Sequence, residues 1–233
     1  MVETRIYHGI TLDIVRAASR KICYIILPEG LKDAGRKWTE DLAARFSSNI
    51  VIISGMNWND DLTPWEAGGV FRKAKPFGGK AGLFLKDLIE DTIPNVEISL
   101  GMRHAERYLL GISLSGLFAL WSIFKCNEFE GVGSISGSLW YDGFVQWAED
   151  RTVPANLRKV FVSLGDKEKR SKERRLASVE GMTIRFVEII REKGVDVEFI
   201  IEENTTHFSP VEQRFEKAIE YLLNPEENTP ESA

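Results

Sequence analysis

The chain has 233 residues, and its 30 basic and 35 acidic residues give a net charge of −5. This acidic balance argues against a protein that grips nucleic acid through a broad basic face, and against binding to an anionic membrane surface. The two cysteines, Cys23 and Cys126, are too few for a disulfide framework and do not cluster with histidines as a zinc site requires. Two free thiols are the simpler prediction, although a single bridge between them stays open.

The sequence carries no visible signal for export or for membrane insertion. Residues 1–10 include Glu3, Arg5 and His8 and contain no apolar run of the kind that a signal peptide needs. No window approaches eighteen consecutive apolar residues, so no transmembrane helix is predicted. These features together predict a cytoplasmic protein.

Strands and helices alternate along the chain. Buried strands are predicted at 22–27, 50–53, 108–112, 131–135, 160–164 and 197–201, and weak alternation adds one or two at 4–7 and 12–15. Helical periodicity lies between them, at 38–46, 81–93, 114–124, 183–193 and 211–223. The pattern predicts the α/β class, with a mostly parallel sheet of about six to eight strands and helices on both faces. No linker interrupts the alternation, so we expect one domain over residues 1–223 and a disordered polar tail at 224–233.

Local signals predict several boundaries. Pro94 predicts the end of the helix at 81–93. Ser209 and Pro210 suit the N-cap and the first position of the last helix. The segment 56–79 is long, irregular and rich in turn residues, which is typical of a functional loop.

The segment 167–175 (KEKRSKERR) is strongly basic. One interpretation of this segment is a patch that binds nucleic acid. Acidic residues are interspersed among its basic ones, however, which favours a solvated loop or helix face.

Ser113 lies on the turn between a predicted strand and an apolar helix. In an open parallel sheet, ligand sites lie at the carboxyl ends of the strands. A serine on such a turn indicates a nucleophile elbow, which exposes the hydroxyl and needs small residues two places before and after it. Gly111 fills the first place, and Ser115 stands where glycine is commoner. The backbone N–H of Leu114, at the helix N-terminus, can face a developing oxyanion. The alternative is a turn that only packs a helix on a strand.

A serine hydrolase also needs a carboxylate at the same sheet edge, to orient its histidine. The strand at 160–164 delivers two candidates, Asp166 and Glu168. Asp166 is closer to the end of the strand, whereas Glu168 lies three residues after Gly165, a spacing at which many hydrolases place the acid. We favour Glu168, with Asp166 as the alternative, and interpret the other one as a solvated acid.

Only one of the three histidines follows a strand and precedes the C-terminal helix. This residue, His207, is in the right place to act as a general base toward Ser113. The chain order serine, acid, histidine is preserved with either acid. His8 and His104 lie in polar segments and are predicted at the surface.

The turn 28–31 follows the strand at 22–27. Backbone N–H groups at Gly30 or Leu31 are candidates for a second oxyanion donor. A Pro-x-Gly sequence after a strand is also simply a turn, which is the alternative interpretation.

Four large aromatic residues fall on loops at the predicted active edge. They predict an aromatic wall for an acyl or aryl group, at Trp58, Trp65, Trp140 and Tyr141. The alternative is that they pack under long loops without touching a substrate.

Several of these segments resemble a known family. Residues 113–120 (SLSGLFAL), 136–140 (SGSLW) and 163–168 (SLGDKE) resemble the esterase D-like branch of the α/β-hydrolase fold, which includes enterobactin esterases, feruloyl esterases and S-formylglutathione hydrolases. The segment 58–65 (WNDDLTPW) looks like the corresponding loop of uncharacterised cytoplasmic hydrolases of that branch. The resemblance runs roughly from residue 22 to residue 223. It departs from the family pattern at Glu29, where histidine often precedes the glycine, and at Ser115.

The resemblance implies an α/β-hydrolase fold and a carboxylic ester hydrolase that uses no metal and no cofactor. It implies an acyl-enzyme on Ser113 and a triad completed by His207 and by Glu168 or Asp166. The expected partner is a small-molecule ester, and neither nucleic acid nor a membrane is expected. Two alternatives stay open, a non-catalytic binding protein on the same fold and a thioesterase or peptidase on the same triad.

Overall fold

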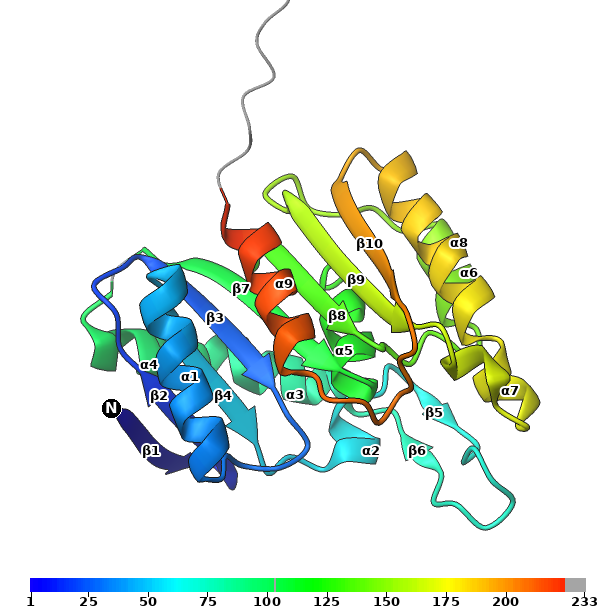
Figure 1. Cartoon of the computed structure of the whole chain (residues 1–233), viewed down its shortest axis with the longest axis horizontal. Helices are drawn as coiled ribbons and strands as arrows, with labels where there is room; N and C mark the ends of the chain where they lie inside the picture. The colour runs from blue at the N-terminus through cyan, green and yellow to red at the C-terminus, as the bar shows by residue number, and fades with distance from the viewer. Residues whose placement is uncertain (103, 225–233) are drawn as a thin grey trace, which may run out of the picture.

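The central element of the fold is one eight-stranded sheet (Figure 1). The computed structural model describes residues 1–102 and 104–224. The sheet order is β1-β2-β4-β3-β7-β8-β9-β10. Its strands are β1 (Val2–Tyr7), β2 (Ile10–Val15), β3 (Lys21–Ile26), β4 (Asn49–Ser54), β7 (Glu106–Ile112), β8 (Gly131–Ile135), β9 (Lys159–Gly165) and β10 (Asp196–Glu202). Strand β2 runs antiparallel to β1 and β4, and the other pairs are parallel, so the predicted mostly parallel sheet is confirmed.

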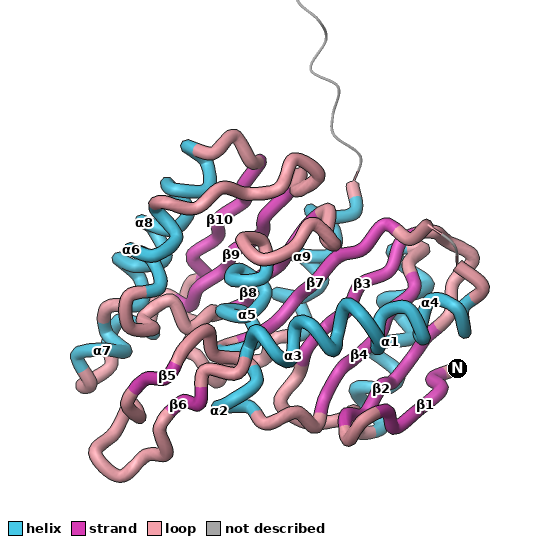
Figure 2. The backbone as a smooth tube through the Cα atoms, turned by 180° about the vertical axis from the view of Figure 1, so that it is seen from behind, coloured by secondary structure: helices cyan, strands magenta, loops and turns pink. Residues whose placement is uncertain are grey.

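Helices cover both faces of the sheet, as predicted. One face carries α1 (Asp33–Phe46) and α9 (Glu212–Leu223), which lie side by side in Figure 1. The opposite face, seen in Figure 2, carries α3 (Ala81–Asp87), α4 (Ile93–Leu100), α5 (Leu114–Ser122), α6 (Phe144–Glu149) and α8 (Val179–Glu192). Two single turns, α2 (Trp58–Asp61) and α7 (Arg174–Ala177), lie near the edge where the parallel strands end.

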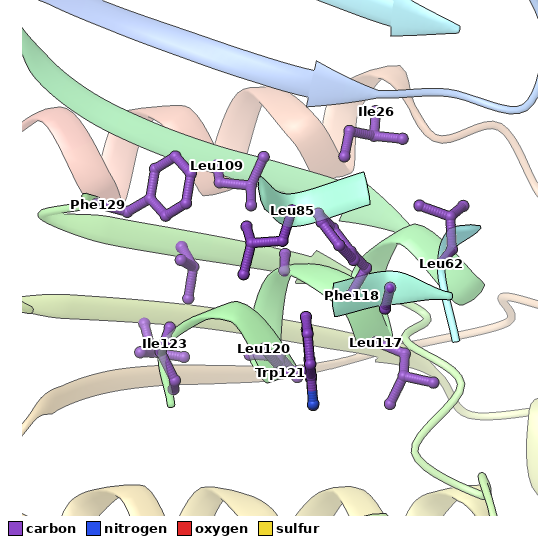
Figure 3. Close-up of a cluster of buried hydrophobic side chains, with 14 of the residues drawn as sticks. Ile26, Leu62, Leu85, Leu109, Leu117, Phe118, Leu120, Trp121, Ile123 and Phe129 are labelled. Atoms are coloured by element: carbon purple, nitrogen blue, oxygen red, sulfur yellow. The ribbon is translucent and has the colours of Figure 1, made fainter. Parts of the chain in front are cut away.

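Two buried clusters hold the layers together, one on each face of the sheet. On the α5 face, Phe118 packs among Leu85 of α3 and Leu109 of β7 (Figure 3). Every residue of α5 is buried, which explains why its sequence is apolar nearly all round. On the other face, Phe215 and Ile219 of α9 belong to the second cluster. The elbow serine therefore lies between a strand and a helix that are both fixed by packing.

The helix predicted at 81–93 does not end before Pro94. A π-helical turn, Leu88–Thr92, joins α3 to α4, and the N–H of Ile93 donates to the carbonyl of Leu88, five residues back. Pro94 falls in the first turn of α4, directly after the π-helical turn, and has no N–H to donate. The predicted stop was therefore wrong, because the wider turn accommodates the proline.

The last helix begins later than predicted. Its N-cap is Val211, not Ser209, and Pro210 lies before the helix. The hydroxyl of Ser209 instead accepts a hydrogen bond from the N–H of Thr206 at 2.9 Å. This serine closes the loop that carries His207, and does not cap α9.

The segment 56–79 is more ordered than a bare loop. It contains α2 and a short hairpin of β5 (Glu66–Ala67) and β6 (Phe77–Gly78). Both cysteines are free, so the open alternative of a bridge is not realised. Among residues 1–102 and 104–224, no helix is long and apolar enough to cross a membrane, and no group of three or more His, Cys, Asp or Glu side chains is arranged to hold a metal ion. The predicted disordered tail lies outside the described residues, apart from Asn224.

Candidate active site

The turn between β7 and α5 has the backbone of a nucleophile elbow. Ser113 adopts φ 56° and ψ −121°, a backbone conformation that residues other than glycine rarely adopt. Its N–H donates to the carbonyl of Ile135 at 3.0 Å, and its carbonyl accepts from the N–H of Ser138 at 3.0 Å. A side chain at Gly111 would collide with the backbone of Ser115. The glycine is therefore required, because strand and helix pass closely at this point.

Ser115, where this chain departs from the family pattern, is fully buried and fully hydrogen-bonded. Its hydroxyl lies 2.8 Å from the carbonyl of Ile26, at the end of β3, and accepts from the N–H of Ile112 at 2.8 Å. The residue thus connects the elbow to the neighbouring strand. A small hydroxyl side chain fits where a larger one could not, so the elbow is kept.

Three residues from three separate loops meet at the carboxyl edge of the sheet. The Nε2 atom of His207 lies 3.1 Å from Oγ of Ser113, and its Nδ1 atom lies 2.9 Å from Oε2 of Glu168. These residues follow β10, β7 and β9, respectively. Hydroxyl, imidazole and carboxylate are each within hydrogen-bond reach of the next, a geometry that can activate a serine hydroxyl.

Glu168, and not Asp166, is the acid that meets the histidine. Its second oxygen, Oε1, accepts from Oγ of Ser136 at 2.5 Å and from the N–H of Gly165 at 2.8 Å. Burial alone would raise the pKa of Glu168, but the hydrogen bonds from His207, Ser136 and Gly165 hold that pKa below its ordinary value. The carboxylate is therefore charged when it faces the imidazole.

Asp166 has a different role. One of its carboxylate oxygens accepts from the N–H of Thr205 at 2.9 Å, and its own N–H donates to the carbonyl of Glu202 at 3.0 Å. The N–H of Lys167 donates to the carbonyl of Thr205 at 3.0 Å. These bonds hold the loop after β10 against the loop after β9, and so fix the position of His207.

The predicted oxyanion donors are only partly brought to the site. Leu114 is the first residue of α5 and directly follows the nucleophile. None of Leu114, Gly30 and Leu31 is among the residues that line the cavity, so adjacency to Ser113 is what favours Leu114. The N–H of Leu31 faces a carboxylate oxygen of Asp13 at 3.5 Å. The structure therefore gives no support for a donor at Leu31, and a donor at Gly30 stays a prediction.

A cavity of about 370 Å³ opens beside the triad. Its walls combine apolar and basic side chains with hydroxyl groups, and are formed by Ser113, Ser138, Trp140, Lys167, Glu168, Arg170, Ser171, Leu176, Val179, Thr206, His207 and Phe208. Trp140 is the one predicted aromatic in this lining. Phe208 is 93% exposed, so a large apolar ring next to His207 stands free at the mouth.

The other three predicted aromatics do not line the cavity. The hydroxyl of Tyr141 donates to the carbonyl of Trp65 at 2.5 Å, and Nε1 of Trp65 donates to the carbonyl of Asp142 at 3.0 Å. Trp58 begins α2 and packs against the core. For these three residues, the packing alternative describes the structure, and only Trp140 faces the cavity.

Sequence reasoning missed most of the remaining lining. The basic segment 167–175 forms a 3₁₀ turn (Glu168–Arg170) and α7, and Lys167 and Arg170 lie at the cavity. Other members of the segment are paired, as Lys169 is with Glu180 at 2.9 Å. A charge count along the chain carries no signal for which of these residues faces the site. His8 and His104 are exposed and take no part in it.

The sequence matches the family model described as "Putative esterase" over residues 17–186. The chain belongs to this esterase family. It is therefore an ester hydrolase, as the resemblance of its motifs implies.

The chain is also similar to individual proteins and solved structures. The chain is 27% identical to the uncharacterized protein YbbA of Bacillus subtilis (strain 168) over 187 residues, which are 77% of this chain and 75% of YbbA. The BES protein from Bacillus cereus has a TM-score of 0.73 at 18% identity, covering 95% of this chain and 95% of that chain. The siderophore hydrolase EstA from Aspergillus nidulans has a TM-score of 0.70 at 18% identity, covering 96% and 94%. These structures share the fold over nearly the whole chain, and the predicted α/β-hydrolase fold is confirmed.

Proposed function

We propose that this esterase cleaves carboxylic esters through an acyl-enzyme on Ser113. The observation that carries the proposal is the hydrogen-bond chain from Oγ of Ser113 through the ring of His207 to the carboxylate of Glu168, with distances of 3.1 Å and 2.9 Å. A free serine hydroxyl is a weak nucleophile and needs such a base. The same contacts, if they only stabilised the fold, would not need a strained backbone at the serine.

In the first half of the reaction, Oγ of Ser113 attacks the ester carbonyl carbon while Nε2 of His207 accepts its proton. The carbonyl oxygen becomes an oxyanion, toward which the N–H of Leu114 can donate. Glu168 accepts the hydrogen bond from Nδ1–H and so stabilises the imidazolium. When the ester C–O bond breaks, Nε2–H gives its proton to the departing alcohol, and the acyl group stays on Ser113.

The second half repeats these steps with water. Nε2 of His207 accepts a proton from water as the water oxygen attacks the acyl carbon. The bond to Oγ of Ser113 then breaks, Oγ receives the proton back from His207, and the carboxylic acid leaves. In each half-reaction His207 accepts one proton and donates one proton, so after both halves Ser113 and His207 have regained their starting protonation states.

The cavity supports a small-molecule ester as the substrate. A volume of about 370 Å³ suits a small acyl or aryl group. Trp140, Leu176, Val179 and Phe208 offer apolar contacts on its walls. We propose that these side chains bind the apolar part of the substrate, and that neither nucleic acid nor a membrane is a partner.

The proposal is tested by labelling with a fluorophosphonate, followed by intact-mass analysis and peptide mapping. We expect one adduct, on Ser113, and no adduct on the H207A variant. Ser113→Ala should lower kcat for a panel of small esters by about a thousandfold or more, without unfolding the protein.

Ser171→Ala is the matched control, because Ser171 also lines the cavity and its hydroxyl accepts from the N–H of Glu173 at 3.2 Å, away from the triad. Its contact with Glu168 is made by the backbone N–H, which alanine keeps. This variant should keep both labelling and hydrolysis. An unlabelled but folded wild-type protein, or full activity in the S113A variant, would contradict the acyl-enzyme mechanism and favour the binding-protein alternative.

A further inference from the structure

Ser136, directly after β8, adopts an unusual backbone conformation. Its φ is 47°, in the left-handed region that favours glycine, and its side chain is 1% exposed. Its N–H donates to the carbonyl of Ser163 in β9 at 2.7 Å, which fixes the strained turn. A glycine would adopt this backbone at lower cost. We therefore expect the hydroxyl group of this serine to have a function that glycine could not provide.

Among residues 1–102 and 104–224, the Ser136 hydroxyl has one hydrogen-bond partner, the carboxylate of Glu168. Its Oγ donates to Oε1 of Glu168 at 2.5 Å, and the N–H of Gly165 donates to the same oxygen at 2.8 Å. The other oxygen, Oε2, is thereby left for Nδ1 of His207. Two donors on one side of the carboxylate hold it in the single orientation that the histidine needs.

We propose that Ser136 is a positioning residue for catalysis, which aims the carboxylate of Glu168 at His207 and keeps it charged. The inference rests on the proposed function of the triad. Ser136 touches neither the cavity nor the nucleophile, so it acts only through Glu168. It extends the triad by one hydrogen bond into the buried end of β8.

The surroundings of Ser136 support this role. Arg214 of α9 is 4% exposed and donates through Nη2 to Oγ of Ser163, the residue that also binds the Ser136 backbone. Its Nε and Nη1 atoms have no hydrogen-bond partner among the described residues. A buried cation is costly unless it interacts with a nearby anion. Burial lowers the pKa of Arg214, and the charges of Glu168 and Glu202 offset part of this lowering.

The other charged groups around Glu168 are already engaged. Asp166 faces Thr205, and Nζ of Lys167 donates to the carbonyl of Asn204 at 3.3 Å. Glu202 of β10 is paired with Lys217 at 2.8 Å. The direct donors to the carboxylate are therefore His207, Gly165 and Ser136, and of these only Ser136 can be changed without removing the base or a glycine that the backbone needs.

Two substitutions separate the hydroxyl from the backbone. Ser136→Ala removes the hydroxyl and keeps the strained side chain, whereas Ser136→Gly removes the hydroxyl and relieves the strain. We expect kcat to fall by about tenfold to a hundredfold in both variants, with KM within about twofold of the wild type. The S136G variant should be the more stable of the two in urea. Ser134→Ala is the matched control, because Ser134 is buried in β8, two residues before Ser136, and its hydroxyl has no hydrogen-bond partner in the part of the chain that the structure describes.

The pH dependence gives a second measurement. Without the hydroxyl, the carboxylate of Glu168 is aimed less well at His207 and stabilises the protonated imidazole less, so the acid limb of kcat/KM should move to lower pH. The titration midpoint of His207, followed by NMR and assigned with the H207A variant, should move in the same direction. This titration does not depend on turnover.

The outcomes are distinct. If both variants keep the wild-type kcat and the wild-type His207 midpoint, Ser136 has no positioning role. If only S136A loses activity, in proportion to its loss of stability, the effect is one of packing and the inference is overturned. Absence of a fluorophosphonate adduct on wild-type Ser113 would instead contradict the proposed function, and the NMR titration would still decide whether Ser136 controls His207.

Discussion

At the scale of single residues, the candidate site depends on which carboxylate faces His207. The sequence predicted Ser113 and His207, because each follows a strand and precedes a helix. It could not separate Glu168 from Asp166, because both follow the same strand. The choice is made by the 3₁₀ turn Glu168–Arg170, which turns Glu168 toward His207 and leaves Asp166 for Thr205. The contact with Ser136 carried no sequence signal at all.

Ser115 provides a prediction at this scale. Ser115→Ala leaves the carbonyl of Ile26 and the N–H of Ile112 without their side-chain partner in a fully buried place. We expect the free energy of unfolding, measured with urea, to fall by about 1–3 kcal/mol. Ser122→Ala is the matched control on α5, because the Ser122 hydroxyl only returns to the carbonyl of Ala119 in its own helix. If both variants lost the same free energy of unfolding, the hydrogen bond from Ser115 to β3 would add no stability beyond that of a hydroxyl bonded within its own helix.

At the scale of elements, Arg175 connects the segments around Trp140, a residue of the cavity wall. Arg175 of α7 lies over the ring of Trp140, with 5.1 Å between Cζ and the ring centroid, and within 5.7 Å of the centroid of Phe77. Its Nε lies 2.9 Å from a carboxylate oxygen of Asp142, and its Nη1 donates to the carbonyl of Gly68 at 2.7 Å. The residue thus joins α7 to the β5–β6 hairpin and to the loop that presents Trp140.

The sequence could not predict this arrangement, for a physical reason. All the predicted aromatics lie on loops, and periodicity carries no information about which way a loop side chain turns. Arg175 stacks on the rings from a segment that looked like a solvated charge run. The same limit applies to Pro94, whose effect on the helix depended on a π-helical turn that the sequence pattern did not indicate.

Arg175 leads to a prediction for substrate binding. Arg175→Ala should free the ring of Trp140 and raise KM for small esters by about threefold to tenfold, with a smaller change in kcat, because the triad is not touched. Arg175→Lys should give an intermediate value, since an ammonium group lacks the planar stacking surface. The exposed neighbour Arg174, changed to Ala, is the control. A larger effect on kcat than on KM in steady-state kinetics would contradict the role of Arg175 as a support for the ring of Trp140.

At the scale of the whole molecule, the order of the strands in the sheet brings the site residues together. The parallel strands β7, β9 and β10 bring residues 113, 168 and 207 to one edge, although up to 94 positions separate them in the sequence. The alternating pattern predicted the class of fold and the edge, because buried parallel strands are continuous apolar runs. The alternating pattern did not predict the cavity, because most of its lining comes from the segments that follow β7, β8, β9 and β10.

The buried acid at this edge also makes the stability of the whole protein depend on pH. The pKa of Glu168 in the folded protein lies below its ordinary value of 4.5. The folded state therefore gains stability from this group above the ordinary pKa, and loses it as the pH falls through the lower folded value. In Glu168→Gln the group cannot titrate, so between about pH 7 and about pH 3 the free energy of unfolding should fall less than in the wild type. Urea unfolding at a series of pH values measures this difference. Glu203→Gln, at an exposed position in the loop before His207, should follow the wild-type curve. Parallel curves for the wild type and E168Q would mean that the hydrogen bonds from His207, Ser136 and Gly165 do not hold the carboxylate in its charged form.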